Sequence, residues 1–166
     1  DVISYDADFS KYKLLLLPAA FITSGAFQMK LRRYVENGAF ACHIPDICKK
    51  QRQCGIYGNT SGRPHRCVWC VCGGGGTNLC GQPKSVHLTL KDTETDSGDG
   101  MWCDLLGGTA EALGTYTSDY KKGAMIVSKN SFGKGKACYL GTDLGERAMG
   151  ELLAGLCREA GMAPVR

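Results

Sequence analysis

The first 44 residues carry three hydrophobic patterns that predict a strand, a helix and a second strand. Residues 13–18, KLLLLP, form a continuous apolar run, which is typical of a strand buried on both faces of a parallel sheet. From Ser24 to Asn37 the apolar positions recur with helical spacing and form one stripe, made of Phe27, Leu31, Tyr34 and Val35. Residues 39–44, AFACHI, predict the second strand, so this part of the chain has the order of a βαβ unit.

Regular patterning returns at residue 85 and predicts an antiparallel meander. Residues 85–92 alternate apolar and polar side chains as a half-exposed strand does, and residues 94–100 are predicted to form an acidic, turn-rich loop. The turn sequences SDYKKG and SFGKGK separate three further predicted strands, at residues 112–116, 124–130 and 136–142.

A final helix is predicted from residue 144 to residue 160. Asp143 and Glu146 have the spacing of a capping box at its start, and Gly161 supplies a stop at its end. Its apolar stripe consists of Met149, Leu152, Leu153 and Leu156. Strands and helices that alternate within 166 residues predict a single α/β domain.

Residues 45–85 follow neither the helical nor the strand period. Gly, Arg, Cys, Pro and His replace the aliphatic residues there, and a patternless stretch of about 40 residues is unusual inside a compact domain. Seven of the ten cysteines lie in or next to this divergent segment: Cys42, Cys48, Cys54, Cys67, Cys70, Cys72 and Cys80. Two explanations stay open. One is a reading frame shifted between about 45 and 85, because these residue types have G-rich codons, and the other is a natural insertion.

The cysteines of this segment are candidate zinc ligands. Cys67 and Cys70 have C-x-x-C spacing, and Cys72 and Cys80 complete a set of four sulfur donors, as tetrahedral zinc requires. Alternative donors are Cys48, Cys54, His43 and His65. A second closely spaced pair is missing, which weakens the motif. A zinc-binding interaction module therefore remains an alternative function.

The bulk composition excludes several classes of partner. The net charge is +4, from 20 basic and 16 acidic residues, and this mild excess does not predict binding to nucleic acid. No apolar run approaches the roughly 20 residues that a membrane span requires. The acidic start DVISYDADFS lacks the basic region of a signal peptide. We therefore expect a cytoplasmic protein with free thiols and no membrane partner.

Four stretches of the chain follow the pattern of one known family. They are SYDADFSKYKLLLLPAAFITS with LRRYVENGAF in the first part, and MWCDLL with EALGTYTSDYKKGAMIVSKNSFGKGKACYLGTDL in the second. Together they cover residues 1–44 and 86–162, and they resemble the middle, or trimerisation, domain of glycoside hydrolase family 42 β-galactosidases. The resemblance implies a flavodoxin-like, class I glutamine amidotransferase-like three-layer sandwich with an added antiparallel meander.

The resemblance also implies a function without catalytic residues. In that family the domain holds subunits together, usually as trimers, and borders the active site of a neighbouring catalytic barrel. We therefore expect a non-catalytic oligomerisation domain that needs no cofactor, whose parent enzyme hydrolyses terminal β-galactosides. The two carboxylates of such a reaction would lie on the barrel, which needs roughly 250 residues of its own. In the family, a further strand and helix normally precede the position of residue 1, so the resemblance leads us to expect that residues 1–166 lack the first strand and helix of the domain.

Cys42 and His43 are an alternative candidate catalytic pair. Amidotransferase relatives place a nucleophile at the end of the corresponding strand, and a reactive thiolate needs a nearby base or a positive field. The sequence AFACHIPD lacks the glycines of a nucleophile elbow. Packing of Cys42 as a small buried hydrophobic residue is the favoured interpretation. A stand-alone Cys-dependent amidotransferase or DJ-1/PfpI-like protein is kept as an alternative.

Overall fold

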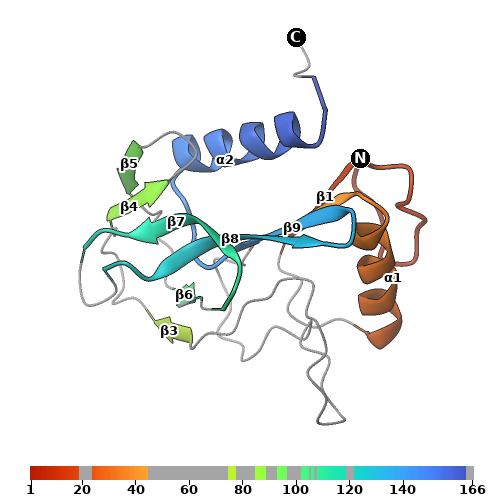
Figure 1. Cartoon of the computed structure of the whole chain (residues 1–166), viewed down its shortest axis with the longest axis horizontal. Helices are drawn as coiled ribbons and strands as arrows, with labels where there is room; N and C mark the ends of the chain where they lie inside the picture. The colour runs from red at the N-terminus through yellow and green to blue at the C-terminus, as the bar shows by residue number, and fades with distance from the viewer. Residues whose placement is uncertain are drawn as a thin grey trace.

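The computed structural model describes residues 1–18, 24–44, 75–77, 85–88, 93–96, 102–104, 106, 108–118 and 122–163. These residues form a mixed α/β fold with two helices (Figure 1). In chain order the elements are β1 (Leu14–Pro18), α1 (Gly25–Glu36), β2 (Phe40–Ile44), β3 (Gly75–Thr77), β4 (Ser85–Leu88), β5 (Thr93–Asp96), β6 (Trp102–Asp104), β7 (Glu111–Tyr116), β8 (Met125–Phe132), β9 (Gly135–Leu140) and α2 (Glu146–Glu159).

Seven of the strands form one sheet in the order β1-β2-β9-β8-β7-β4-β5. The pairs β1–β2 and β2–β9 are parallel. The pairs β9–β8, β8–β7, β7–β4 and β4–β5 are antiparallel. β9 therefore joins a parallel part built from the start of the chain to an antiparallel part built from its second half. β3 and β6 pair in a separate two-stranded sheet.

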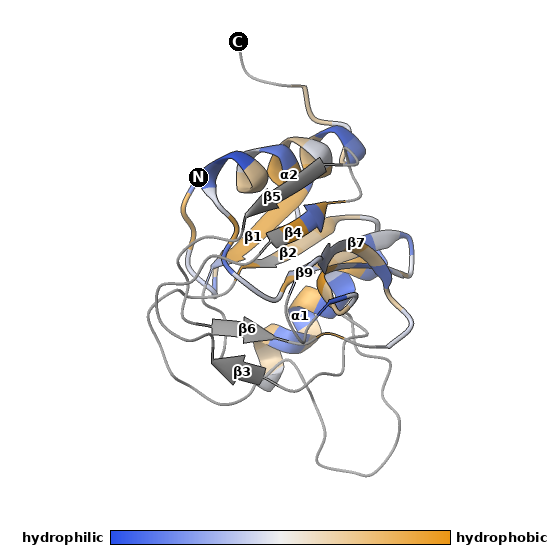
Figure 2. Ribbon diagram, turned by 90° about the vertical axis from the view of Figure 1, so that its left-hand side faces the viewer, coloured by the Kyte–Doolittle hydropathy of each residue, from blue (hydrophilic) through white to orange (hydrophobic). Residues whose placement is uncertain are grey.

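The two helices cover opposite faces of the large sheet (Figures 1 and 2). Successive strand residues point to opposite faces, so each strand contributes to two separate hydrophobic clusters. The cluster under α1 includes Phe27, Leu31, Val35, Leu15, Leu17, Ala41 and Tyr139. The cluster under α2 includes Leu152, Leu156, Cys42, Cys138, Leu140 and Ile126. The order of layers is thus helix, sheet and helix.

Both ends of α1 agree with the sequence. The Ser24 side chain accepts a hydrogen bond from the Phe27 N–H at 3.2 Å, which caps the first turn. Asn37 is the C-terminal cap, and Gly38 follows with a φ of 110°, a conformation that glycine adopts without steric cost. The predicted helix from Ser24 to Asn37 is therefore confirmed.

The predicted capping box of α2 is wrong. The N-terminal cap is Gly145, and no side chain caps the helix. Asp143 lies two positions before that cap, because the buried Leu144 fixes the chain against the sheet and the first helical residue is Glu146. Glu146 in the first turn still interacts favourably with the helix dipole. Gly161, with a φ of 66°, ends the helix as predicted.

The predicted strands of the second half are present, with three additions, which are β3, β5 and β6. β4, β7, β8 and β9 lie where alternation and turn sequences place them. The predicted loop at residues 94–100 is wrong for its first part, because β5 pairs with β4 in an antiparallel hairpin. β5 is the last strand of the sheet, and polar residues are tolerated at such an edge. β3 lies in the segment where no regular element is predicted.

Candidate interaction site

The site begins at the edge of the large sheet formed by β1. β1 pairs in parallel with β2 on one side, and the sheet order places no described strand on its other side. The N–H of Phe40, the first residue of β2, donates a hydrogen bond to the Lys13 carbonyl oxygen at 2.9 Å. Because backbone groups alternate in direction along a strand, those of Leu15 and Leu17 face β2 and those of Leu14 and Leu16 face the open side.

The side chains of this edge strand are apolar on both faces. Leu15 and Leu17 are buried toward α1, and Leu14 is half-buried against the cluster under α2. Leu16 is 40% exposed, so the prediction that the whole strand is buried on both faces is wrong for this residue. Natural edge strands are usually short, charged or covered. An apolar parallel strand at an edge is therefore a surface suited to a partner.

An apolar groove of about 620 Å³ accompanies this edge. It is lined by residues 1–5, by β1 itself, and by Phe9, Tyr12, Phe27, Cys157 and Met162. Two large apolar side chains of the N-terminal wall lie in solvent, since Val2 is fully exposed and Tyr5 is 54% exposed. The groove thus continues the hydrophobic surface of β1 onto both neighbouring elements.

The N-terminal wall of the groove is attached to α1 by aromatic contacts. The Tyr5 and Phe27 rings meet edge to face with centroids 4.9 Å apart, and Phe9 packs in the same manner on Phe27 and Tyr34. The Lys30 ammonium lies 4.5 Å from the centroid of the Phe9 ring. Residues 1–9 are therefore packed onto the domain and hold one side of the groove in place.

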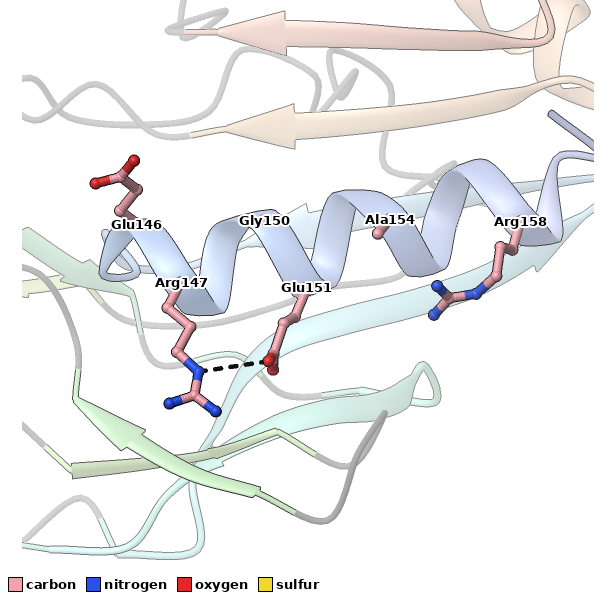
Figure 3. Close-up of a pocket in the computed structure, with 6 residues that line it drawn as sticks. All are labelled: Glu146, Arg147, Gly150, Glu151, Ala154 and Arg158. Carbon is pink, nitrogen blue, oxygen red and sulfur yellow. Dashed lines mark ion pairs between the residues drawn. The ribbon is translucent and has the colours of Figure 1, made fainter. Parts of the chain in front are cut away.

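The outer face of α2 has a different character (Figure 3). Glu146, Arg147, Glu151 and Arg158 line it, with Gly150 and Ala154 between them. Arg147 and Glu151 form an ion pair of 3.6 Å one helical turn apart. Alternating charges around small residues are typical of a solvated helix face.

The C-terminal end of α2 is joined to the sheet by a cluster of charged side chains. Lys129 on β8 lies 3.2 Å from a Glu111 carboxylate oxygen and 3.3 Å from one of Glu159, and Lys136 on β9 also pairs with Glu159. Burial would raise the pKa of Glu159, but Lys136 and Lys129 outweigh it and lower that pKa. The sequence patterns did not reveal this cluster, because its members come from four separate elements.

The candidate nucleophile Cys42 lies inside β2 and is 1% exposed. It is paired in register with Cys138 of β9, and the hydrogen bond that the Cys138 thiol makes to Cys42, together with burial, raises the pKa of the Cys138 thiol. His43, the other member of the candidate pair, follows Cys42 in β2, and the structure describes its backbone. A packed thiol of this kind has the surroundings of a core residue rather than of a reactive nucleophile. The catalytic role of Cys42 and His43 stays a prediction that nothing in these contacts supports.

The candidate zinc ligands Cys67, Cys70, Cys72 and Cys80 lie outside the described residues. Zinc binding by these cysteines therefore stays a prediction, which the zinc content of protein purified without chelator tests. Within the described ranges, no three His, Cys, Asp or Glu side chains come together in a group that could hold a metal ion. In the same part of the chain, no helix has the length and hydrophobicity needed to cross a membrane.

These features define an α/β domain whose candidate site is an apolar sheet edge with an adjoining groove. The sequence profile of the β-galactosidase trimerisation domain family matches residues 1–42 and 77–163. The chain belongs to this family, which is the middle domain of glycoside hydrolase family 42 enzymes.

Individual β-galactosidases resemble the chain over nearly its whole length. β-Galactosidase LacA of Lactobacillus acidophilus is 28% identical over 164 residues, which are 98% of this chain and 24% of that protein. The crystal structure of β-galactosidase from Bacillus circulans sp. alkalophilus superposes with a TM-score of 0.80 and 25% identity, covering 99% of this chain and 25% of that one. The structure of a catalytic mutant of Gan42B, a GH42 β-galactosidase from G. stearothermophilus, has the same TM-score at 23% identity and supports the fold. It covers 99% of this chain and 24% of that one. The chain thus spans about a quarter of the length of these relatives.

Proposed function

We propose that this domain holds together the subunits of a homotrimeric β-galactosidase and borders the active site of a catalytic barrel in the same polypeptide. The parent enzyme would hydrolyse terminal β-galactosides with residues of that barrel, and residues 1–166 would contribute none of its catalytic groups. The single observation that carries the proposal is the match of residues 1–42 and 77–163 to the trimerisation domain family.

The first test is to sequence the gene on both sides of the region that encodes residues 1–166. We expect the reading frame to continue into a segment of roughly 250 residues with the repeated strand–helix pattern of a barrel. A gene that encodes these 166 residues alone would overturn the proposal.

The second test compares the complete protein with residues 1–166. The complete protein should sediment as a trimer and release nitrophenol from a nitrophenyl β-galactoside, whereas residues 1–166 should release none. A monomeric complete enzyme would refute the oligomerisation role. Hydrolysis by residues 1–166 alone would refute the assignment of catalysis to the barrel.

We infer that the fold is the flavodoxin-like, amidotransferase-like sandwich of the family and that a further strand of the same polypeptide completes its sheet beside β1. Helices on both faces and a parallel β1-β2-β9 arrangement support the sandwich, and the β7-β8-β9 hairpins correspond to its added meander. The outward backbone groups of Leu14 and Leu16 and the apolar groove suit a parallel strand with apolar side chains on both faces. Residues 1–166 would then be one domain that lacks its first strand and helix.

Amide hydrogen exchange tests this completion residue by residue. The amides of Leu14 and Leu16 should exchange rapidly in residues 1–166 and slowly in a protein that also contains the segment encoded ahead of residue 1. The amides of Leu15 and Leu17 face β2 and should be protected in both, which makes them internal controls. Equal exchange of Leu14 and Leu16 in the two proteins would contradict the added strand.

A further inference from the structure

Cys42 and Cys138 face each other where the two parts of the large sheet meet. The register of β2 and β9 places them directly opposite, and both are free thiols with exposures of 1% and 2%. β2 belongs to the N-terminal parallel part, whereas β9 belongs to the C-terminal meander. The pair therefore lies at the seam between segments that are far apart in the sequence.

The geometry of this pair is compatible with a covalent link. Both side chains belong to the cluster under α2 and so project from the same face of the sheet. Neighbouring strands lie about 4.8 Å apart, within the range of roughly 4.4–6.8 Å between the α-carbons of a disulfide. The hydrogen bond that Cys138 donates to Cys42 and the burial of Cys138 raise the pKa of the Cys138 thiol, so little thiolate forms while α2 covers it.

We propose that Cys42 and Cys138 close to a disulfide in the presence of a small-molecule disulfide such as oxidised glutathione, and that this bond fastens β2 to β9. The thiolate of one cysteine attacks the small disulfide, forms a mixed disulfide and releases one glutathione thiol. The second cysteine attacks the protein sulfur of the mixed disulfide, forms the Cys42–Cys138 bond and releases the second glutathione thiol. Two protein thiols are oxidised and one small disulfide is reduced, and the two thiol protons end on the released glutathione.

Local opening of α2 controls the exchange, because the helix covers both sulfur atoms. Leu152 and Leu156 of α2 lie in the same buried cluster as the two thiols. Oxidation should therefore be slow in the native protein and faster during refolding or in mild urea, when α2 is transiently displaced. Once formed, the bond closes a loop of nearly 100 residues and restricts the unfolded chain, which raises stability.

The test is peptide mapping of the protein after refolding with oxidised glutathione. A non-reduced digest should contain one linked pair of peptides that carries Cys42 and Cys138. The thermal unfolding midpoint should rise by at least about 5 °C relative to the same sample reduced with dithiothreitol. Recovery of the two cysteines as free thiols, as glutathione adducts or linked to other cysteines would overturn the proposal, as would an unchanged or lower midpoint.

Two variants give matched controls. Cys138→Ala should abolish both the linked peptide pair and the difference in midpoint between oxidised and reduced samples. Cys157→Ala removes a half-buried thiol of α2 that is not opposite Cys42 and should leave both effects intact. Each variant is compared with its own reduced form, so a lower baseline stability does not affect the result.

Discussion

The α-carbon of Gly135 lies so close to the Val35 carbonyl oxygen that a Cβ atom at this position would overlap it. The Ala39 carbonyl oxygen lies equally close on another side, so the glycine is enclosed by main-chain atoms that side-chain movement cannot displace. This contact brings the start of β9 against the end of α1 and the loop that leads into β2. The absence of a side chain at residue 135 is therefore a condition for the parallel pairing of β2 with β9.

Gly135→Ala should lower the free energy of unfolding by about 3 kcal/mol, because the added carbon forces β9 away from α1. Urea unfolding measures the change. Gly150→Ala is the matched control, since a Cβ there meets nothing within 4 Å and the position is inside α2. The control should raise the free energy of unfolding by about 0.5–1 kcal/mol. Equal effects of the two substitutions would show that the close approach of Gly135 is unimportant.

Ser24→Ala should lower the free energy of unfolding by about 1 kcal/mol, because it leaves the Phe27 N–H in the first turn of α1 without its acceptor. Ser24→Asp keeps an oxygen acceptor at the same place and should stay close to the wild type. Loss of stability in both variants would indicate that the hydroxyl has a role other than capping.

Glu159→Gln should lower the free energy of unfolding by about 1 kcal/mol at pH 7, because Lys129 and Lys136 lose their shared carboxylate. Since the pKa of Glu159 is lowered in the folded protein, its contribution is present above the unfolded-state pKa and disappears as the pH falls through the folded-state pKa. The difference between wild type and variant should therefore shrink below about pH 4. Unfolding measured from pH 3 to pH 7 checks both statements.

Glu151→Gln is the control for that series. Its ion pair with Arg147 lies on the outer face of α2, where the Arg147 side chain is 83% exposed, and exposed pairs of this type contribute less than about 0.5 kcal/mol. If Glu151→Gln lowered the free energy of unfolding as much as Glu159→Gln, the charged cluster at the C-terminal end of α2 would contribute no more than an exposed ion pair.

Iodoacetamide should label Cys157 well before Cys42 or Cys138 in the folded protein. Cys157 is half-buried at the groove beside β1, whereas the other two thiols are enclosed beneath α2. Mass mapping of labelled peptides over time measures the order, and labelling in urea provides the reference for unfolded thiols. Rapid stoichiometric labelling of Cys42 near neutral pH would instead revive the nucleophile hypothesis.

Local sequence patterns were sufficient for the elements whose signals are local. The apolar stripe of α1 and the turn sequences of the meander each act within a few residues, and the structure contains the elements that they predict. β5 was missed because an edge strand carries little hydrophobic alternation, and the capping box failed because Asp-x-x-Glu also occurs without capping.

The candidate sites depended on relationships that no local pattern contains. The apolar run Leu14–Leu17 predicts a strand in a sheet but does not reveal that β1 lies at its edge. That Cys42 faces Cys138 follows from the register between strands formed by distant parts of the chain. Such positions are set by the packing of the whole domain, so they could be read only from the structure.

The place of β9 between β2 and β8 also constrains the order of events during synthesis on the ribosome. The β1–α1–β2 unit leaves the exit tunnel before the meander does, and the parallel neighbour of β2 is made roughly a hundred residues after β2. Throughout that interval β2 exposes an apolar edge on which a nascent neighbour could pair wrongly. The hairpin β8–β9 can form at once when it emerges, and its docking onto β2 then becomes the slow, long-range step that completes the sheet.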